Sequence, residues 1–166
     1  FSDRTFQKYW LARFLTLVSL ETISVCVAWQ IYDITRDPLY LGLVGLTQFL
    51  PLILLVVITG YVSDNYNRKR IFAFCLSIES IIAMSFIYIN SMNEIEVKIL
   101  FIPLIGLGIV RAFVGPAASS LLPNIVKTKD LPDAVALSAV AWQMGTIFGP
   151  ITGGILYGIS SFSAYL

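Results

Sequence analysis

The sequence contains no histidine, few charged residues and only two cysteines. Without histidine, a catalytic triad of the Ser-His-Asp kind is excluded, and a serine or cysteine nucleophile would need an unusual base. Cys26 and Cys75 lie inside apolar runs and lack the CxxC spacing of a zinc site, so we expect both to be small buried residues. The sequence therefore predicts neither an enzyme nor a metal site.

Charge is scarce in this chain. Only 13% of the residues are charged, whereas an ordinary soluble domain carries about a quarter. The net charge is +1, and the basic residues form short clusters between apolar runs instead of following one face. A nucleic-acid partner is therefore not expected.

Apolar residues make up 57% of the 166 residues, and the mean hydropathy is +0.82. Such an excess cannot be buried inside a water-soluble domain, so we expect it to face lipid. A transmembrane helix needs about 20 mainly apolar residues. Five stretches meet that length, and they are residues 10–32, 41–62, 71–89, 99–121 and 134–157. A sixth is expected to start near Phe162. The predicted fold is an all-α, polytopic membrane bundle.

Most of the Lys and Arg residues lie in the segments outside these spans, and most of those segments are expected on the same side of the membrane. Cytoplasmic loops of membrane proteins carry the excess of basic residues. The amino-terminal flank, the second connection and the fourth connection contain Arg4, Lys8, Arg13, Arg68, Lys69, Arg70, Lys127 and Lys129. We therefore predict a multi-pass protein of the cell membrane with a cytoplasmic amino terminus.

Three ionisable residues, Glu21, Glu79 and Arg111, fall near the middle of their predicted spans. A charged side chain at the centre of a bilayer costs about 2.5 to 3.5 kcal/mol even on lenient scales, so these residues should face one another or a watery cavity. One hypothesis makes Glu21, or else Glu79, a proton-binding carboxyl whose state is coupled to Arg111. The alternative is a fixed ion pair that joins helices, with Glu79 neutral against lipid or a neighbouring helix.

The fifth predicted span contains a stripe of glycines. Gly145, Gly149 and Gly153 are spaced by four residues, so they lie on one helical face where another helix can approach closely. Pro150 removes a backbone donor and is expected to bend the helix at Thr146. An ordinary packing face between membrane helices would show a similar stripe.

Three segments together resemble the signature motifs of the major facilitator superfamily. The loop motif G-x-x-x-D-x-x-G-R-K-R, between the second and third helices, is matched by Gly60, Asp64, Arg68, Lys69 and Arg70. Asn67 replaces its second glycine, and asparagine also tolerates a left-handed turn.

The other two motifs belong to the fourth and fifth helices of the superfamily. Arg111 and Gly115 match R-x-x-Q-G, with Val114 in place of the polar residue. The motif G-x-x-x-G-P-x-x-G-G, associated with antiporters, is matched by Gly145, Gly149, Pro150, Gly153 and Gly154. Residues 9–13, 37–43 and 131–136 are similar to the enterobactin-exporter and macrolide-efflux branch.

The resemblance implies that residues 1–166 form most of the first six-helix half of a twelve-helix transporter. The substrate would be a small amphipathic molecule, such as a drug, macrolide or siderophore, bound between this half and a missing carboxy-terminal half. Export would use the proton gradient without a cofactor, with Glu21 and Arg111 handling the proton. Asp64 and Arg68 would latch the cytoplasmic gate, and the Gly149-Pro150 segment would supply a bend.

Other functions remain open at this stage. The same fold could serve a lipid or lysophospholipid flippase or a proton-linked importer, and a non-transporting scaffold or sensor would use the buried charges structurally. The substrate itself is not specified by the residues. Gln48 and Gln143 are candidate polar contacts in the cavity, whereas Phe49, Trp142 and Phe148 are expected to be packing residues.

Overall fold

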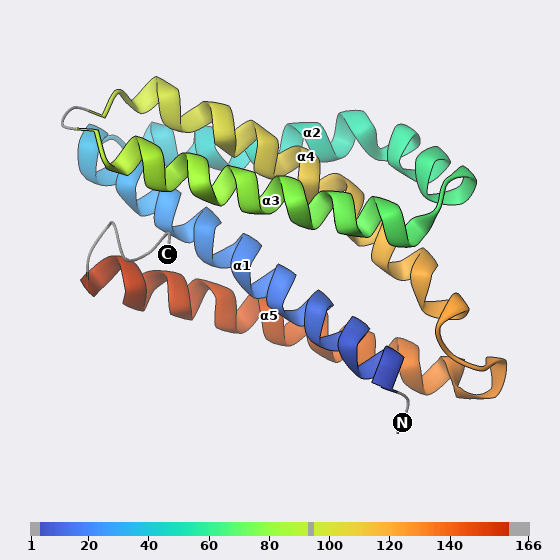
Figure 1. Cartoon of the computed structure of the whole chain (residues 1–166). Helices are drawn as coiled ribbons and strands as arrows, with labels where there is room; N and C mark the ends of the chain where they lie inside the picture. The colour runs from blue at the N-terminus through green and yellow to red at the C-terminus, as the bar shows by residue number, and fades with distance from the viewer. Residues whose placement is uncertain (1–3, 93–94, 160–166) are drawn as a thin grey trace.

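The computed structural model describes residues 4–92 and 95–159, apart from the side chain of Asp64. Regular structure within these residues is entirely helical, with five long α-helices and two short 3-10 turns between the fourth and fifth of them (Figure 1). The elements are α1 (Arg4–Thr35), α2 (Pro38–Asn65), α3 (Arg68–Asn90), α4 (Val97–Leu121), η1 (Leu122–Asn124), η2 (Thr128–Asp130) and α5 (Leu131–Ile159).

The five predicted spans are confirmed as helices, and each long helix described is long and apolar enough to cross a membrane. Most of them extend past the apolar stretch that predicted them; α1, for example, begins at Arg4 and not near Trp10. Helical hydrogen bonding continues into the polar flanks, where hydropathy carries no signal. The predicted sixth span, near Phe162, lies outside the described residues.

The connections between the first three helices are short, and a capping side chain begins the next helix in each of them. Asp37 caps α2 by accepting a hydrogen bond from the Leu39 backbone at 2.9 Å. Asn67 caps α3 by accepting from the Lys69 and Arg70 backbones at 3.1 and 3.3 Å. Its φ of −65° means that Asn67 does not adopt the left-handed turn considered from the sequence. Among the described residues other than glycine, only Arg36 has a positive φ, at 52°.

The helices pack in two groups. α1 and α5 lie side by side and share the most extensive contact, while α4 packs against both α2 and α3 (Figure 1). Smaller contacts of α1 with α4 and α2 join the groups. Among the described residues, the five largest fully buried side chains come from α1, α3 and α4, and they are Phe86, Ile31, Leu100, Leu104 and Leu107. Cys26 and Cys75 are also buried, as the sequence predicted.

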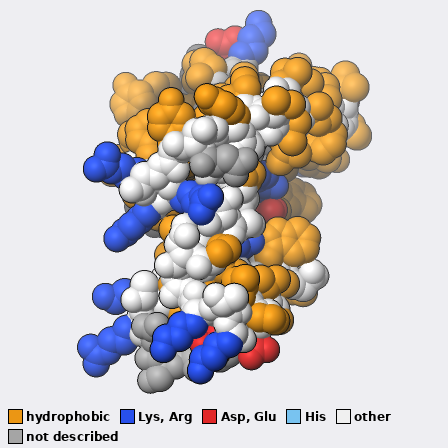
Figure 2. Space-filling view, turned by 90° about the vertical axis from the view of Figure 1, so that its right-hand side faces the viewer, with side chains coloured by type: hydrophobic (Ala, Val, Ile, Leu, Met, Phe, Trp, Pro, Cys, Tyr) orange, Lys and Arg blue, Asp and Glu red, His pale blue; other side chains and the backbone are white. Residues whose placement is uncertain are grey.

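Large apolar side chains are exposed over much of the outer surface. Val57 is 78% exposed and Ile102 is 70% exposed, as expected for side chains that face lipid. Figure 2 looks onto the end of the bundle that carries the start of α1 and the α2–α3 and α4–α5 connections, and Lys and Arg side chains gather there. The structure thus brings the predicted basic segments to one end of the bundle.

Candidate functional site

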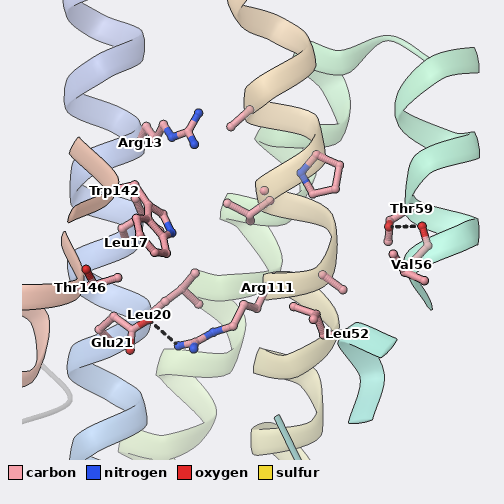
Figure 3. A pocket seen from close by; sticks show the side chains of 15 residues that line it. Arg13, Leu17, Leu20, Glu21, Leu52, Val56, Thr59, Arg111, Trp142 and Thr146 are labelled. Carbon is pink, nitrogen blue, oxygen red and sulfur yellow. Dashed lines mark hydrogen bonds and ion pairs between the residues drawn. The ribbon is translucent and has the colours of Figure 1, made fainter. Parts of the chain in front are cut away.

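A cavity of about 380 Å³ lies between α1, α2, α4 and α5. Most of its lining is apolar, as shown by Leu17, Leu20 and Leu52 (Figure 3). Its charged lining residues are Arg13, Glu21 and Arg111. An apolar hollow with a few convergent polar groups is the usual form of a small-molecule site.

Glu21 and Arg111 form an ion pair across this cavity. The Arg111 Nη2 atom lies 3.3 Å from the Glu21 Oε1 atom, which joins α4 to α1 (Figure 3). The two side chains are 29% and 23% exposed, so both remain accessible from the cavity. The pairing expected from the cost of burying charge is therefore present, while its part in proton transfer stays a prediction.

Gly145, Gly149 and Gly153 are buried on the face of α5 that packs against α1. A Cβ atom added at Gly145 would lie 2.6 Å from the Leu17 Cβ, and one at Gly153 would lie 2.9 Å from the Thr22 carbonyl oxygen. Both distances are shorter than real Cβ contacts allow. The glycine stripe is thus a helix-packing seam, and its partner is α1.

Gly149 lies at the level of the ion pair. A Cβ atom added there would collide with the Cβ of Glu21 and lie 3.1 Å from the Val18 carbonyl oxygen. The Thr22 hydroxyl donates to the Gly149 carbonyl oxygen at 3.1 Å and lies 2.7 Å from the Thr152 hydroxyl. The seam therefore fixes the backbone that carries Glu21.

The remaining residues of the fifth-helix motif have different environments. Helix α5 continues through Pro150 without interruption, and the bend expected at Thr146 stays a prediction. A Cβ atom at Gly154 would meet no other atom of the described part of the chain within 4 Å. Of the glycines in this motif, the three spaced ones are therefore those whose packing against described residues requires the absence of a side chain.

Glu79 does not line the cavity that contains Glu21 and Arg111. It faces a separate hollow of about 370 Å³ between α1 and α3, together with Thr16, Ser19 and Ser80. Ser19 and Glu21 are two residues apart on α1, which corresponds to a rotation of about 200°, so they lie on opposite sides of that helix. Glu21 and Glu79 therefore face different hollows, although the sequence places them at similar depths in their spans.

The burial of Glu79 is nearly complete, at 5% exposure, and neither carboxyl oxygen has a hydrogen-bond partner among the described residues. An unpaired buried carboxylate is costly, by roughly several kcal/mol. Glu79 is therefore a separate candidate from the ion pair, and its role as a proton site stays a prediction.

The loop motif lies at the basic end of the bundle. The Arg68 Nε atom donates to the Ser63 carbonyl oxygen at 3.3 Å, which ties the start of α3 to the end of α2. The side chains of Lys69 and Arg70 are exposed, and a Cβ atom at Gly60 would meet no described atom within 4 Å. The predicted latch through Asp64 falls on a side chain outside the described part of the chain.

Neither glutamine proposed as a cavity residue lines the cavity. Gln48 is 7% exposed, and its side chain exchanges two hydrogen bonds with Ser24, at 3.0 and 2.8 Å, between α1 and α2. Gln143 is exposed on α5 and lies outside the set of lining residues. Substrate contact by either stays a prediction that this geometry does not support.

Two cavity residues were assigned to other roles from the sequence. Trp142 was expected to be a packing residue, yet it is 51% exposed and lines the cavity. Arg13 was counted with the basic amino-terminal flank, yet its side chain points into the same space (Figure 3). Four-residue spacing with Leu17 and Glu21 is the sequence signal that could have placed Arg13 on the cavity face of α1.

Membrane-length helices that enclose a cavity with a charged pair define a multi-pass membrane protein with an internal polar site. The family model described as transmembrane secretion effector matches residues 1–165. The chain therefore belongs to this family of the major facilitator superfamily, as an amino-terminal half. No solved structure matches the chain.

Curated relatives agree with this family. The enterobactin exporter EntS of Salmonella choleraesuis strain SC-B67 is 32% identical over 156 residues, which cover 91% of this chain and 36% of that protein. EntS proteins of Citrobacter koseri and Escherichia coli O1:K1 are 28% and 30% identical over 159 and 156 residues, with the same coverage. The chain thus spans about a third of the length of these relatives, and the resemblance to the enterobactin-exporter branch is confirmed.

Proposed function

We propose that this chain forms the amino-terminal half of a proton-coupled exporter that moves a small amphipathic molecule by alternating access. The ion pair between Glu21 and Arg111 carries this proposal, because it places an accessible carboxylate and its counter-ion at mid-depth in a cavity. The family and the exporters among its relatives support a transport role.

The ion pair gives a physical route from proton binding to a change of shape. Glu21 belongs to α1 and Arg111 belongs to α4, so their attraction holds the two helices together across the cavity. A proton on Glu21 removes the negative charge and with it the Coulomb attraction between the groups. Arg111 is then free to bind another acceptor, and the preferred separation of α1 and α4 changes.

The proton gradient would supply the energy, without a cofactor. Proton entry and exit would alternate between the two sides of the membrane as the cavity opens to each. The basic end of the bundle would face the cytoplasm, because Lys and Arg residues gather there (Figure 2). Asp64 and Arg68 would contact the remaining half of the protein at that end and stabilise its closed state.

The decisive experiment uses the complete protein in sealed proteoliposomes with an imposed pH gradient. Enterobactin, named in the curated relatives, is the first substrate to test. We expect Glu21→Gln to lose at least about tenfold in gradient-driven flux, because the variant side chain cannot exchange a proton. Glu96→Gln is the matched control, since Glu96 lies in an exposed ion pair with Lys98 outside the cavity.

Each outcome separates the competing functions. Full gradient-driven flux in Glu21→Gln would reduce the ion pair to a structural link. Flux of a lysophospholipid but not of enterobactin would favour the flippase, and accumulation on the opposite side would favour an importer. A wild-type protein that moves no solute and no protons under any gradient would favour a scaffold or sensor.

A further inference from the structure

Arg13 lies inside the helix bundle, although its place in the sequence suggests a membrane-surface anchor. It is partly buried on α1, and its guanidinium group points into the space between α1 and α4 (Figure 3). In that view it lies on the same side of α1 as Glu21. Eight residues separate the two, a distance of about 12 Å along the helix axis.

Two hydrogen bonds hold Arg13 in this position. Its Nη1 atom donates to the Tyr9 hydroxyl oxygen at 2.9 Å, and the Tyr9 hydroxyl donates to the Ala118 carbonyl oxygen of α4 at 2.8 Å. Tyr9 is itself 6% exposed. Long basic side chains often extend along a helix toward the membrane surface. Here the contact through a buried tyrosine directs the guanidinium toward α4.

Arg13 and Trp142 line two hollows at once. One is the 380 Å³ cavity that contains the ion pair, and the other is a hollow of about 390 Å³ near the α4–α5 connection. The second hollow is formed by the end of α4, the first residue of η1 and the start of α5, through Ser119, Leu122, Val135, Ser138 and Ala139. Arg13 therefore lies between the basic end of the bundle and the ion pair.

The charges around the two hollows do not balance. Their charged lining residues are Arg13, Glu21 and Arg111, and Glu21 is already paired with Arg111. Within the described residues no carboxylate lies at ion-pair distance from Arg13. A guanidinium group has five N–H donors, and the tyrosine hydroxyl offers one acceptor. This leaves a positive charge with unused donors beside an apolar cavity.

A second polar group in the same hollow has a hydrogen-bonding capacity that the described residues do not use. The Ser138 hydroxyl is buried, with the residue 4% exposed, and no hydrogen-bond partner lies near it among the described atoms. A ligand with several acceptor oxygens could bind the guanidinium of Arg13 and, after a small adjustment of the serine side chain, its hydroxyl. An oxyanion matches these donors best, because hydrogen bonds between an ionised donor and an ionised acceptor are the strong ones.

We propose that Arg13 binds an anionic group of the transported molecule, so that the substrate is an amphipathic organic anion. Its apolar part would lie against Trp142 and the leucines of the cavity, and its carboxylate, sulfonate or phosphate would meet Arg13. This inference rests on the proposed transport function and specifies the substrate class of the same cavity.

A matched pair of small ligands tests the charge preference. Binding of 2-naphthoate and of its uncharged analogue 2-naphthamide is measured by calorimetry on the purified complete protein, without a pH gradient. We expect the wild type to bind 2-naphthoate roughly tenfold or more tightly, as a charge-assisted hydrogen bond implies. Arg13→Gln should remove this preference and leave the affinity for 2-naphthamide unchanged.

Three variants complete the design. Arg13→Lys should keep part of the preference, because it retains the charge but loses the planar fork of donors. Trp142→Ala should weaken both ligands alike, because it removes apolar contact only. Arg4→Gln, at an exposed basic residue on the same helix, should change neither affinity.

Equal affinity of the wild type for the two ligands overturns the inference whether or not the Arg13 variants fold. A preference for 2-naphthoate that persists in Arg13→Gln also overturns it. Because no gradient is used, the result is independent of proton coupling. Anion binding that depends on Arg13, combined with normal flux in Glu21→Gln, would remove the proposed coupling and leave the anion site intact.

Discussion

Gly149 of α5 lies directly against Glu21 of α1, so closely that a methyl group on the glycine would occupy the space of the glutamate's Cβ atom. The fifth-helix motif and the acidic residue of the first helix are therefore one structural unit. Gly145 and Gly153 extend the same contact by one turn in each direction, against Leu17 and Thr22.

This contact makes Gly149→Ala a sharp test of the seam. The added methyl must push α5 away from α1, and we expect a loss of about 1 to 3 kcal/mol in stability, typical of overpacking. Transport should fall with it, because Glu21 moves relative to Arg111. Thermal unfolding of the complete protein in detergent measures the first effect, and vesicle flux measures the second.

Gly154→Ala is the control for that experiment. Its added methyl would meet no atom of the described residues within 4 Å, and alanine favours a helix over glycine by roughly 0.5 to 1 kcal/mol. Stability should be unchanged or higher. A Gly149→Ala protein that matched Gly154→Ala in melting temperature would show that the seam is looser than the geometry indicates.

Exchanging the two charges of the ion pair separates its structural and transport roles. Glu21→Arg alone and Arg111→Glu alone each bring two like charges together, so both should lower the melting temperature. The double variant restores an ion pair and should recover stability through a positive coupling energy. We expect transport to stay lost, because the proton site has moved from α1 to α4. Recovery of both properties would favour a purely structural pair.

Glu79→Gln should keep the protein as stable as the wild type or make it more stable. Neither oxygen of Glu79 meets the geometry of a hydrogen bond with a described residue, and an isolated buried carboxyl carries a desolvation cost whenever it is ionised, so the amide of the same shape removes that cost. Melting temperature and gradient-driven flux report the result. A large loss of flux with stability intact would identify Glu79 as a second proton site.

Cysteine accessibility tests the predicted orientation. The native Cys26 and Cys75 are buried, so they give little background with a membrane-impermeant maleimide. Ser91→Cys, in the exposed turn after α3, should react in intact cells, and Tyr66→Cys, between α2 and α3, only after permeabilisation. The reverse pattern would place the amino terminus outside.

The sequence predicted the helices well because lipid imposes a simple requirement. A span must be apolar and about 20 residues long, whatever its neighbours are. It also predicted that the ionisable residues at that depth would face one another or a watery cavity, because an unpaired charge there is costly, but it left open which glutamate would meet Arg111. Both arguments depend on local composition and depth alone.

The rotation of each helix about its own axis, which decides the neighbours that each side chain faces, could not be predicted from the sequence. Glu79 shares the depth of Glu21 but faces a different hollow, because depth says nothing about which side of a helix a residue occupies. The same lack of information about rotation explains why Gln48 was assigned to the cavity, although its side chain bonds to Ser24 between α1 and α2. Arg13 was missed because counting basic residues near a span treats them all as surface groups, whereas its contact with Tyr9 directs it inward.

The division of the bundle into an α1–α5 pair and an α2–α3–α4 group has a mechanical consequence. In the second half of α1, Ser24 and Gln30 bond to Gln48 of α2 and Asn90 of α3, so the two groups are tied at that end. Toward the basic end, Glu21 with Arg111 and Tyr9 with Ala118 are the polar cross-ties described between α1 and α4. A single proton on Glu21 would therefore remove one of these two contacts between α1 and α4. The hydrogen bonds of Ser24 and Gln30 would still hold the two groups together at the opposite end, so the α1–α5 pair could swing away from α4 about that end.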